Sequence, residues 1–129
     1  MSGISDLNTL LRTMDPVASQ ETFVFVSILH EAIPSTLVSC GRFKEAEGIT
    51  LICEEREALK HNLSYDCQYR RITLNVHSSL QAVGFLAAIS HALAAAEIPC
   101  NVVSAFYHDH LFIPVPQAEQ ALQVLRSFA

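Results

Sequence analysis

Apolar residues occupy alternate positions along one stretch of the chain and short continuous runs along others. In residues 71–77 the apolar side chains fall at every second position, at Ile72, Leu74 and Val76. This period of two is typical of a strand with one buried face. Residues 22–29 are rich in β-branched and aromatic side chains, which also favours a strand. Further strands are expected from about Thr36 and over residues 49–53, 100–106 and 111–115.

Helical spacing dominates the segments between these strands. In residues 82–96, Phe85, Ile89 and Leu93 recur every fourth position, which predicts a helix with one buried row. A final helix is expected over residues 116–128, after Pro116, and another over residues 54–63. A first helix is expected to end near Met14, before Pro16, with Ser5 or Asp6 as its cap and an apolar stripe formed by Ile4, Leu7, Leu10 and Leu11.

The order of these elements predicts two similar halves. Residues 52–63 align weakly with residues 115–126, so that Ala58 and Leu59 fall on Ala121 and Leu122. Each half contains most of a βαββαβ ferredoxin-like unit, but no strand is expected after Ala129. Residues 64–77 are therefore expected to supply edge strands, and the chain is divided into residues 1–63 and 64–129, with strands shared between the halves.

Composition excludes several classes of protein. Half of the 129 residues are hydrophobic, and 16% are charged, which favours a folded domain over intrinsic disorder. Thirteen acidic residues against eight basic ones give a net charge of −5, so a nucleic-acid partner is not expected. The longest apolar stretch, residues 82–89, is too short to cross a membrane.

The start of the sequence and its cysteines favour a cytoplasmic protein. Residues 1–6 lack the basic region and apolar core of a secretory signal. The four cysteines have neither the spacing of a redox pair nor that of a structural zinc site, so we expect all four to be small core residues: Cys40, Cys53, Cys67 and Cys100.

Two groups of residues are candidates for chemistry. Within a strand, His108 and His110 would face one side about 6.6 Å apart and could share a metal ion. A hairpin tip over residues 107–110 explains the same residues without a metal, and we expect no metal or cofactor. Ser78 and Ser79 lie between a strand and a helix, where they could help bind an anion or could simply cap the helix.

The segment RITLNVHSSLQAVGFLAAISHALAAAEIPCNVVSAFYHDHLFIP, residues 71–114, resembles an ACT domain. The segments VHSSLQAVG, PCNVVSAFYHDH and EAEGITL are similar to those of small bacterial proteins with two ACT-like units in tandem. The resemblance covers nearly the whole chain. It implies an α+β fold of tandem ferredoxin-like βαββαβ units with mainly antiparallel sheet and helices on one face, paired as in aspartokinase regulatory regions.

The resemblance also implies a function and a site. ACT domains commonly bind amino acids or other small metabolites beside the loop between the first strand and the first helix, where two units meet. This loop corresponds here to residues 77–83, followed by the loop glycine Gly84. The neighbouring strand would present Asn101 and Val102. The implied ligand-binding residues are His77, Ser78, Ser79, Leu80, Val83, Gly84, Asn101 and Val102.

We therefore expect a non-catalytic regulatory module, often a homodimer, that binds a small amino acid or a similar anion where two units meet. The alternative is a structural or oligomerisation adaptor without a ligand. An enzyme built around His108 and His110 is a third hypothesis, which would require a bound metal.

Overall fold

The computed structural model describes residues 6–129, and the chain divides into two compact units. One unit, here called the split unit, combines residues 6–20 with residues 70–129. The other, the inserted unit, comprises residues 21–69. This division differs from the expected boundary after residue 63, because the start of the chain pairs with a strand from its second half.

The sheet of the split unit has the strand order β1-β5-β7-β6. These strands are β1 (Pro16–Ala18), β5 (Tyr69–Leu74), β6 (Asn101–Ser104) and β7 (Asp109–Pro114). β1 pairs antiparallel with β5, so that Pro16 lies opposite Leu74. The fourth strand of this sheet, β1, therefore precedes the other three by more than fifty residues in the sequence. As a result, β5 is a central strand of this sheet rather than the edge strand expected from the sequence.

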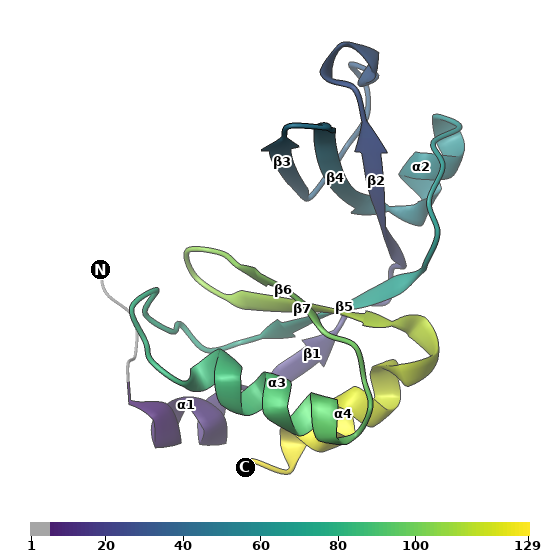
Figure 1. Cartoon of the computed structure of the whole chain (residues 1–129). Helices are drawn as coiled ribbons and strands as arrows, with labels where there is room; N and C mark the ends of the chain where they lie inside the picture. The colour runs from purple at the N-terminus through teal and green to yellow at the C-terminus, as the bar shows by residue number, and fades with distance from the viewer. Residues whose placement is uncertain (1–5) are drawn as a thin grey trace. The chain divides into compact units, whose positions relative to one another are not determined.

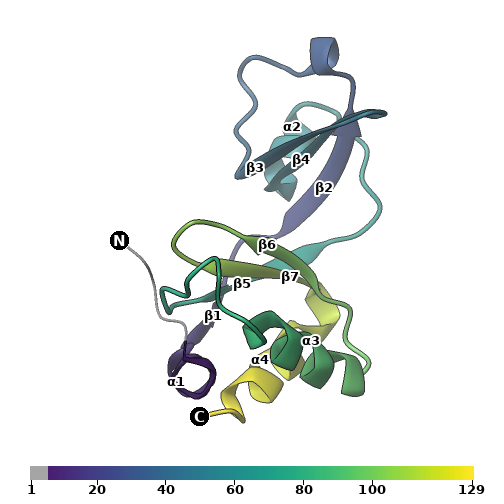
Figure 2. The same cartoon turned by 60° about the vertical axis from the view of Figure 1, so that its left-hand side comes forward.

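Two amphipathic helices cover one face of this sheet, α3 (Phe85–Ala95) and α4 (Ala118–Arg126), as Figures 1 and 2 show. A 3-10 turn, η2 (Val115–Gln117), precedes α4. The predicted row on α3 is confirmed, because Phe85, Ile89 and Leu93 are all buried. They belong to one apolar core with buried residues of α1, β5, β7 and α4, including Leu10, Ile72, Leu111 and Leu125.

The first helix, α1 (Leu7–Thr13), is capped by Asp6, whose carboxylate accepts a hydrogen bond of 3.0 Å from the Thr9 amide. The hydrogen bonds from Thr9 lower the pKa of Asp6. Ile4 and Ser5, which the sequence suggested for the stripe and the cap, lie outside the described residues. The helix ends at Thr13, with Met14 as its C-cap, ahead of Pro16 as expected.

The inserted unit repeats the same strand plan on a smaller scale. Its sheet has the order β3-β4-β2, built from β2 (Phe23–Ile28), β3 (Gly41–Glu45) and β4 (Gly48–Glu54). On the other side of β2, Phe23 pairs with Tyr69 at the start of β5. α2 (Glu55–Lys60) packs on a core formed by Val24, Val26, Ile49, Leu51, Cys53 and Ala58.

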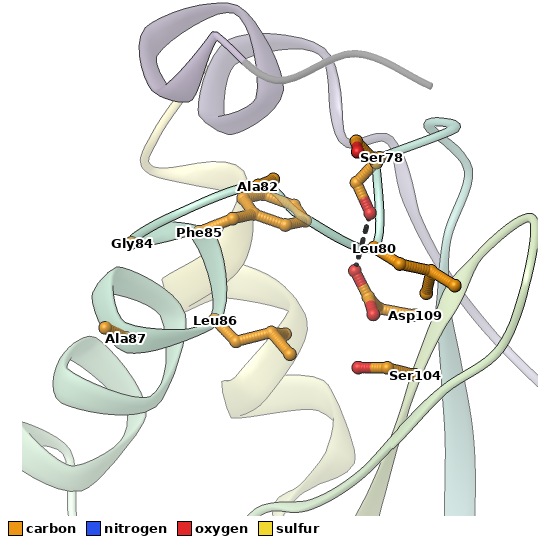
Figure 3. Close-up of a pocket in the computed structure, with 10 residues that line it drawn as sticks. Ser78, Leu80, Ala82, Gly84, Phe85, Leu86, Ala87, Ser104 and Asp109 are labelled. Atoms are coloured by element: carbon orange, nitrogen blue, oxygen red, sulfur yellow. Dashed lines mark hydrogen bonds between the residues drawn. The ribbon is translucent and has the colours of Figure 1, made fainter. Parts of the chain in front are cut away.

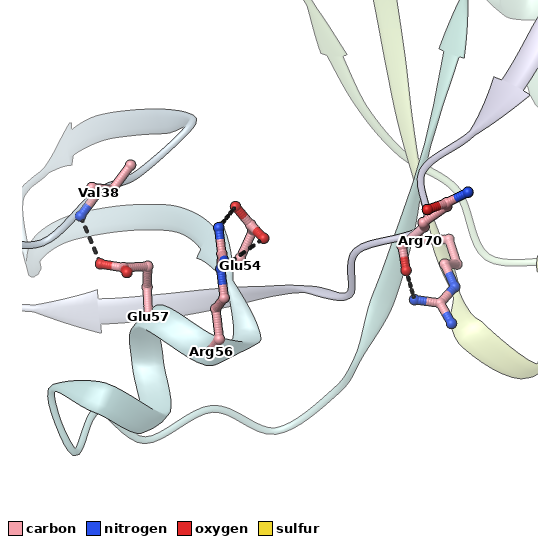
Figure 4. A network of polar contacts seen from close by, with 6 residues as sticks. Val38, Glu54, Arg56, Glu57 and Arg70 are labelled. Carbon is pink, nitrogen blue, oxygen red and sulfur yellow. Dashed lines mark hydrogen bonds and ion pairs between the residues drawn. The ribbon is translucent and has the colours of Figure 1, made fainter.

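The segment between β2 and β3 contains no α-helix. It holds one 3-10 turn, η1 (His30–Ala32), and then an irregular stretch to residue 40. The Val38 amide donates a 2.9 Å hydrogen bond to the Glu57 carboxylate of α2, which ties this stretch to the helix (Figure 4). The predicted start of this strand, at about Thr36, is wrong, because β3 begins only at Gly41.

Two other expectations need correction. The tip of the second hairpin was expected at residues 107–110, but Asp109 and His110 belong to β7. Ala105 donates to the His108 carbonyl and closes the turn earlier. The four cysteines are not all core residues: Cys53 is buried and Cys100 is half-buried, whereas Cys40 and Cys67 are exposed. These two lie in irregular segments, where no neighbouring element covers them.

Candidate functional site

A pocket in the split unit lies between the segment before α3, the first turn of α3 and the β6–β7 hairpin (Figure 3). Its volume is about 140 Å³. The segment contributes Ser78, Ser79, Leu80 and Ala82, the helix start contributes Gly84, Phe85, Leu86 and Ala87, and the hairpin contributes Ser104 and Asp109. Two separate parts of the sequence, residues 78–87 and the β6–β7 hairpin, therefore meet at this site.

The β6–β7 hairpin places a carboxylate in the pocket. Ser104 pairs with Asp109 across the hairpin, so both side chains lie on the face of the sheet that α3 covers. Asp109 is only 5% exposed, and its Oδ2 accepts a 2.9 Å hydrogen bond from the Ser78 hydroxyl. A carboxylate has about four acceptor positions, and this bond uses one of them. Since a buried charge is costly unless it is paired, the site favours a positively charged group next to Asp109.

The first turn of α3 provides donors on another side of the pocket. The helix begins after Gly84, which has a φ of 91° and offers no side chain to cap the helix. Within residues 6–129, no acceptor is recorded for the amides of Phe85, Leu86 and Ala87. Such uncapped amides carry part of the positive end of the helix dipole and attract anions. The pocket therefore presents donors for an anion and an acceptor for a cation.

Other amides of the preceding segment are already paired. Ser78 donates to the Val76 carbonyl, Gln81 to the Ser79 hydroxyl and Ala82 to the Ser79 carbonyl. These bonds shape the segment as two successive turns. The amides of Ser78, Gln81 and Ala82 are therefore not available to bind an anion.

Four of the predicted site residues line this pocket: Ser78, Ser79, Leu80 and Gly84. The helix starts later than expected, so neither serine caps it, and Ser79 caps a local turn at Gln81 instead. The alternative that the serines cap the helix is wrong, because the N-cap position is Gly84.

The other four predicted residues do not line the pocket. The His77 ring lies against Tyr107 and Phe106 of the hairpin tip, with ring centroids 5.2 and 6.2 Å away. Val83 is 85% exposed. Asn101 and Val102 lie toward the far end of β6 from Ser104, and Asn101 is about 10 Å along the strand at about 3.3 Å per residue.

Sequence reasoning missed Asp109 and Ser104. Asp109 was assigned to a polar hairpin tip because Asp favours turns. One signal in the sequence was available, since residues 109–113 continue the alternation of the strand, with Asp109, Leu111 and Ile113 on one face. That alternation places Asp109 on the buried face with the two aliphatic residues.

His108 and His110 point to the other face of the sheet. Their ring centroids are 6.4 Å apart, and the Nδ1 atom of His110 lies 3.0 Å from the Thr73 hydroxyl. Burial, with smaller effects of Arg71 and His108, lowers the pKa of His110. Among residues 6–129, no three side chains of the His, Cys, Asp or Glu type are placed to hold a metal ion.

Cys100 is not placed for nucleophilic chemistry. Burial raises the pKa of its thiol to about 11, so the reactive thiolate is scarce near neutral pH. Cys53, in the inserted unit, also has its pKa raised, chiefly by burial. None of the described helices has the length and apolar character needed to span a membrane.

Solved structures with the same fold include one close relative. A protein of unknown function from Vibrio cholerae, described as a possible transport protein, is 38% identical over 99% of both chains, with a TM-score of 0.85. A protein from Agrobacterium tumefaciens is 17% identical, covers 84% of this chain and 83% of its own, and has a TM-score of 0.70.

A third structure is the ligand-free regulatory subunit of aspartate kinase from Thermus thermophilus. It is 9% identical, with 92% of this chain and 98% of that chain covered and a TM-score of 0.68. At this identity, the likeness shows a shared fold. None of the curated proteins matches the sequence.

The family is shown by the sequence itself. One model of the ACT domain matches residues 2–70, and a second matches residues 66–127. ACT domains are typically regulatory, ligand-binding modules, as in the regulatory subunits of aspartate kinase. The α+β architecture and the two ACT-like units in tandem expected from the sequence are confirmed. With two tandem matches along its length, the chain belongs to the ACT domain family.

Proposed function

We propose that this protein is a non-catalytic regulatory module that binds a small α-amino acid in the pocket beside Asp109. The observation that carries the proposal is the buried Asp109 carboxylate facing the uncapped start of α3. An amino acid has a carboxylate that suits the helix amides and an ammonium group that suits Asp109. An anion without an ammonium group would leave the Asp109 carboxylate unpaired and would be repelled by its negative charge.

The pocket volume limits the size of this ligand. A cavity of about 150 Å³ in an engineered protein holds benzene, which has six carbon atoms. The volume here, about 140 Å³, therefore suits amino acids of roughly six or seven non-hydrogen atoms, such as alanine or serine. Larger side chains would have to extend out of the pocket.

We further propose that the protein acts as a homodimer in the cytoplasm. Four large apolar side chains near the pocket are more than half exposed: Leu80, Val83, Phe106 and Tyr107. A second copy that covered them would also shield the bound ligand from water, which strengthens its electrostatic contacts. Cys40 and Cys67 are exposed and form no disulfide, which suits a reducing compartment.

The test is a thermal-shift screen of the twenty amino acids at millimolar concentration. A ligand at 100 times its dissociation constant stabilises the protein by about 2.7 kcal/mol, which would raise the melting temperature by roughly 10 °C. We expect the largest shift with the smallest polar or aliphatic amino acids, and no shift with the matching amines or carboxylic acids alone. If no amino acid shifts the melting temperature, the sensor proposal fails.

Asp109→Asn is the diagnostic variant, because it keeps the shape of the side chain and removes its charge. We expect it to weaken amino-acid binding at least tenfold while leaving the Ser78 contact possible. Glu119→Gln is the matched control, since Glu119 is exposed in the same unit and does not line the pocket. If the amino acid raises the melting temperature equally in both variants, Asp109 does not contribute to binding.

The second candidate function is an oligomerisation adaptor, which the same exposed apolar side chains favour. An adaptor would show a constant sedimentation mass with and without every amino acid tested. Gly84→Ala would then change only its stability. A mass or a melting temperature that responds to one amino acid would exclude the adaptor.

A further inference from the structure

The split unit contains a second pocket, where the C-terminal ends of α1 and α4 approach each other. Its volume is about 270 Å³, roughly twice that of the pocket beside Asp109. The two pockets have no lining residue in common. The second one is lined by residues 11–16, 125, 126 and 129.

The lining of this pocket divides into an apolar part and a basic part. Met14, Pro16 and Leu125 are buried, and Leu11 is half-buried. Two exposed arginines complete the wall: Arg12 from the last turn of α1 and Arg126 from the last turn of α4. Such a combination suits a molecule with an apolar body and an anionic end.

The charge of Arg12 acts on Asp6 at the start of the same helix, where it helps the hydrogen bonds from Thr9 to lower the pKa of the carboxyl. Within residues 6–129, neither Arg12 nor Arg126 forms an ion pair or a side-chain hydrogen bond. Each one, taken alone, stabilises the C-terminal end of its own helix. That role does not explain why both guanidinium groups border the same apolar hollow.

We propose that this pocket binds a medium-chain aliphatic carboxylate. The hydrocarbon would lie on Leu11, Met14 and Leu125, and the carboxylate would accept hydrogen bonds from the guanidinium groups, whose planar donors match a carboxylate. By comparison with the cavity of about 150 Å³ that holds benzene, 270 Å³ holds roughly ten or eleven non-hydrogen atoms. Octanoate has this size.

Asp15 lowers the expected affinity for octanoate, and its substitution tests the proposal. Asp15 is exposed and lines the same pocket, so its negative charge repels an anion. Its φ of 45° is unusual for a residue with a side chain, but Asn adopts this region as readily as Asp. Asp15→Asn therefore removes the charge without disturbing the backbone, and it should tighten octanoate binding about two- to threefold.

The experiment is a titration of the whole chain with octanoate, monitored through the methyl resonance of Met14 in NMR spectra. We expect a saturable shift at millimolar concentration or below, little response to acetate, and weaker binding of octanol. Arg126→Gln and Arg12→Gln should each weaken octanoate binding at least threefold, and the double variant at least tenfold. Arg42→Gln, at an exposed position of β3, is the matched control.

The proposal is overturned if octanoate produces no saturable shift, if octanol binds as tightly, or if the double variant binds octanoate unchanged. Circular dichroism and melting of each variant verify that these exposed substitutions leave the fold intact. Asp109→Asn should bind octanoate like the original protein. The outcome is therefore independent of the amino-acid proposal for the other pocket.

Discussion

The two units of this chain have the same order of strands in their sheets, with β5, β7 and β6 in one corresponding to β2, β4 and β3 in the other. They differ in the segment that follows β5 and β2. In the split unit, β5 leads through turns and Gly84 into the 11-residue helix α3. In the inserted unit, β2 leads into a three-residue 3-10 turn and an irregular segment. Only the split unit therefore combines an uncapped helix start with a buried carboxylate. The strand scaffold of the ACT domain does not by itself create a ligand site.

The boundary between the units falls within β5, with Tyr69 in the inserted unit and residues 70–74 in the split unit. β1, from the start of the chain, pairs with β5 in the split unit, and the first residue of β5 pairs with Phe23 in the inserted unit. The same stretch thus serves both units. Four predictions test how far the difference between the units extends, beginning with the largest effect.

Leu93→Ala should cost about 3 kcal/mol in the free energy of unfolding, because Leu93 is completely buried in the larger core of the split unit. Hydrogen exchange should show reduced protection of the amides of α3. Leu59→Ala, at a 61% exposed position of the inserted unit, should cost less than about 0.5 kcal/mol. Equal costs at the two positions would contradict the described burial.

Cys100 of the split unit should be alkylated far more slowly than Cys40 of the inserted unit. With a pKa of about 11, Cys100 is ionised in roughly one molecule in a thousand at pH 8. Cys40 is exposed, and alkylation by iodoacetamide is monitored for each thiol by peptide mass spectrometry. We expect rates that differ about a hundredfold or more. Comparable rates would show that Cys100 is not protected.

Gly84→Ala should cost about 1–2 kcal/mol, because a side chain at a φ of 91° is strained. The added Cβ atom itself would meet only Leu7 at an ordinary 3.6 Å. Gly41→Ala in the inserted unit is the control, since Gly41 has no positive φ and its nearest contact, with Ile52, is 3.4 Å. Urea unfolding measures the free energy of unfolding of both variants. If Gly84→Ala costs no more than Gly41→Ala, the backbone at residue 84 does not have the described positive φ, and α3 begins at another residue.

Glu57→Gln should have the smallest effect, and the effect should depend on pH. The Val38 amide is the main cause that lowers the pKa of Glu57 from its ordinary value of 4.5. The resulting stabilisation is present above about pH 4.5 and is lost as the pH falls through the lower folded value. The variant should therefore be less stable than the original near neutral pH and equally stable in acid.

Chemical denaturation at several pH values measures this difference, with Glu119→Gln as the control for removal of an exposed charge. A difference between the two proteins that is the same at pH 3 and pH 7 would mean that the Val38 contact does not depend on the charge of Glu57.

Local patterns in the sequence predicted most elements of the fold. The alternation at Ile72 and Leu74 and the row Phe85, Ile89 and Leu93 each specify one buried face, and both are confirmed. The pairing of Pro16–Ala18 with β5 could not be predicted, because a three-residue strand has no pattern and its partner lies more than fifty residues away. Strand pairing depends on the whole sheet.

The candidate site was predicted only where it is local in sequence. Ser78, Ser79, Leu80 and Gly84 lie within seven positions of one another, and the structure brings them to one pocket. Asp109 comes from a different element, and its position depends on the register of the β6–β7 hairpin. A shift of one residue would have placed it on the opposite face. Resemblance to a family could not supply this residue, because it lies outside the loop to which the family assigns its ligand.

The most direct test of amino-acid binding beside Asp109 is an NMR titration of the labelled protein with L-alanine and L-serine, observing every backbone amide. We predict saturable shifts at Phe85, Leu86 and Ala87 and near Asp109, with none at the corresponding segment after β2, and their loss in Asp109→Asn. Absence of shifts at millimolar ligand, or shifts centred on the inserted unit, would contradict this binding mode.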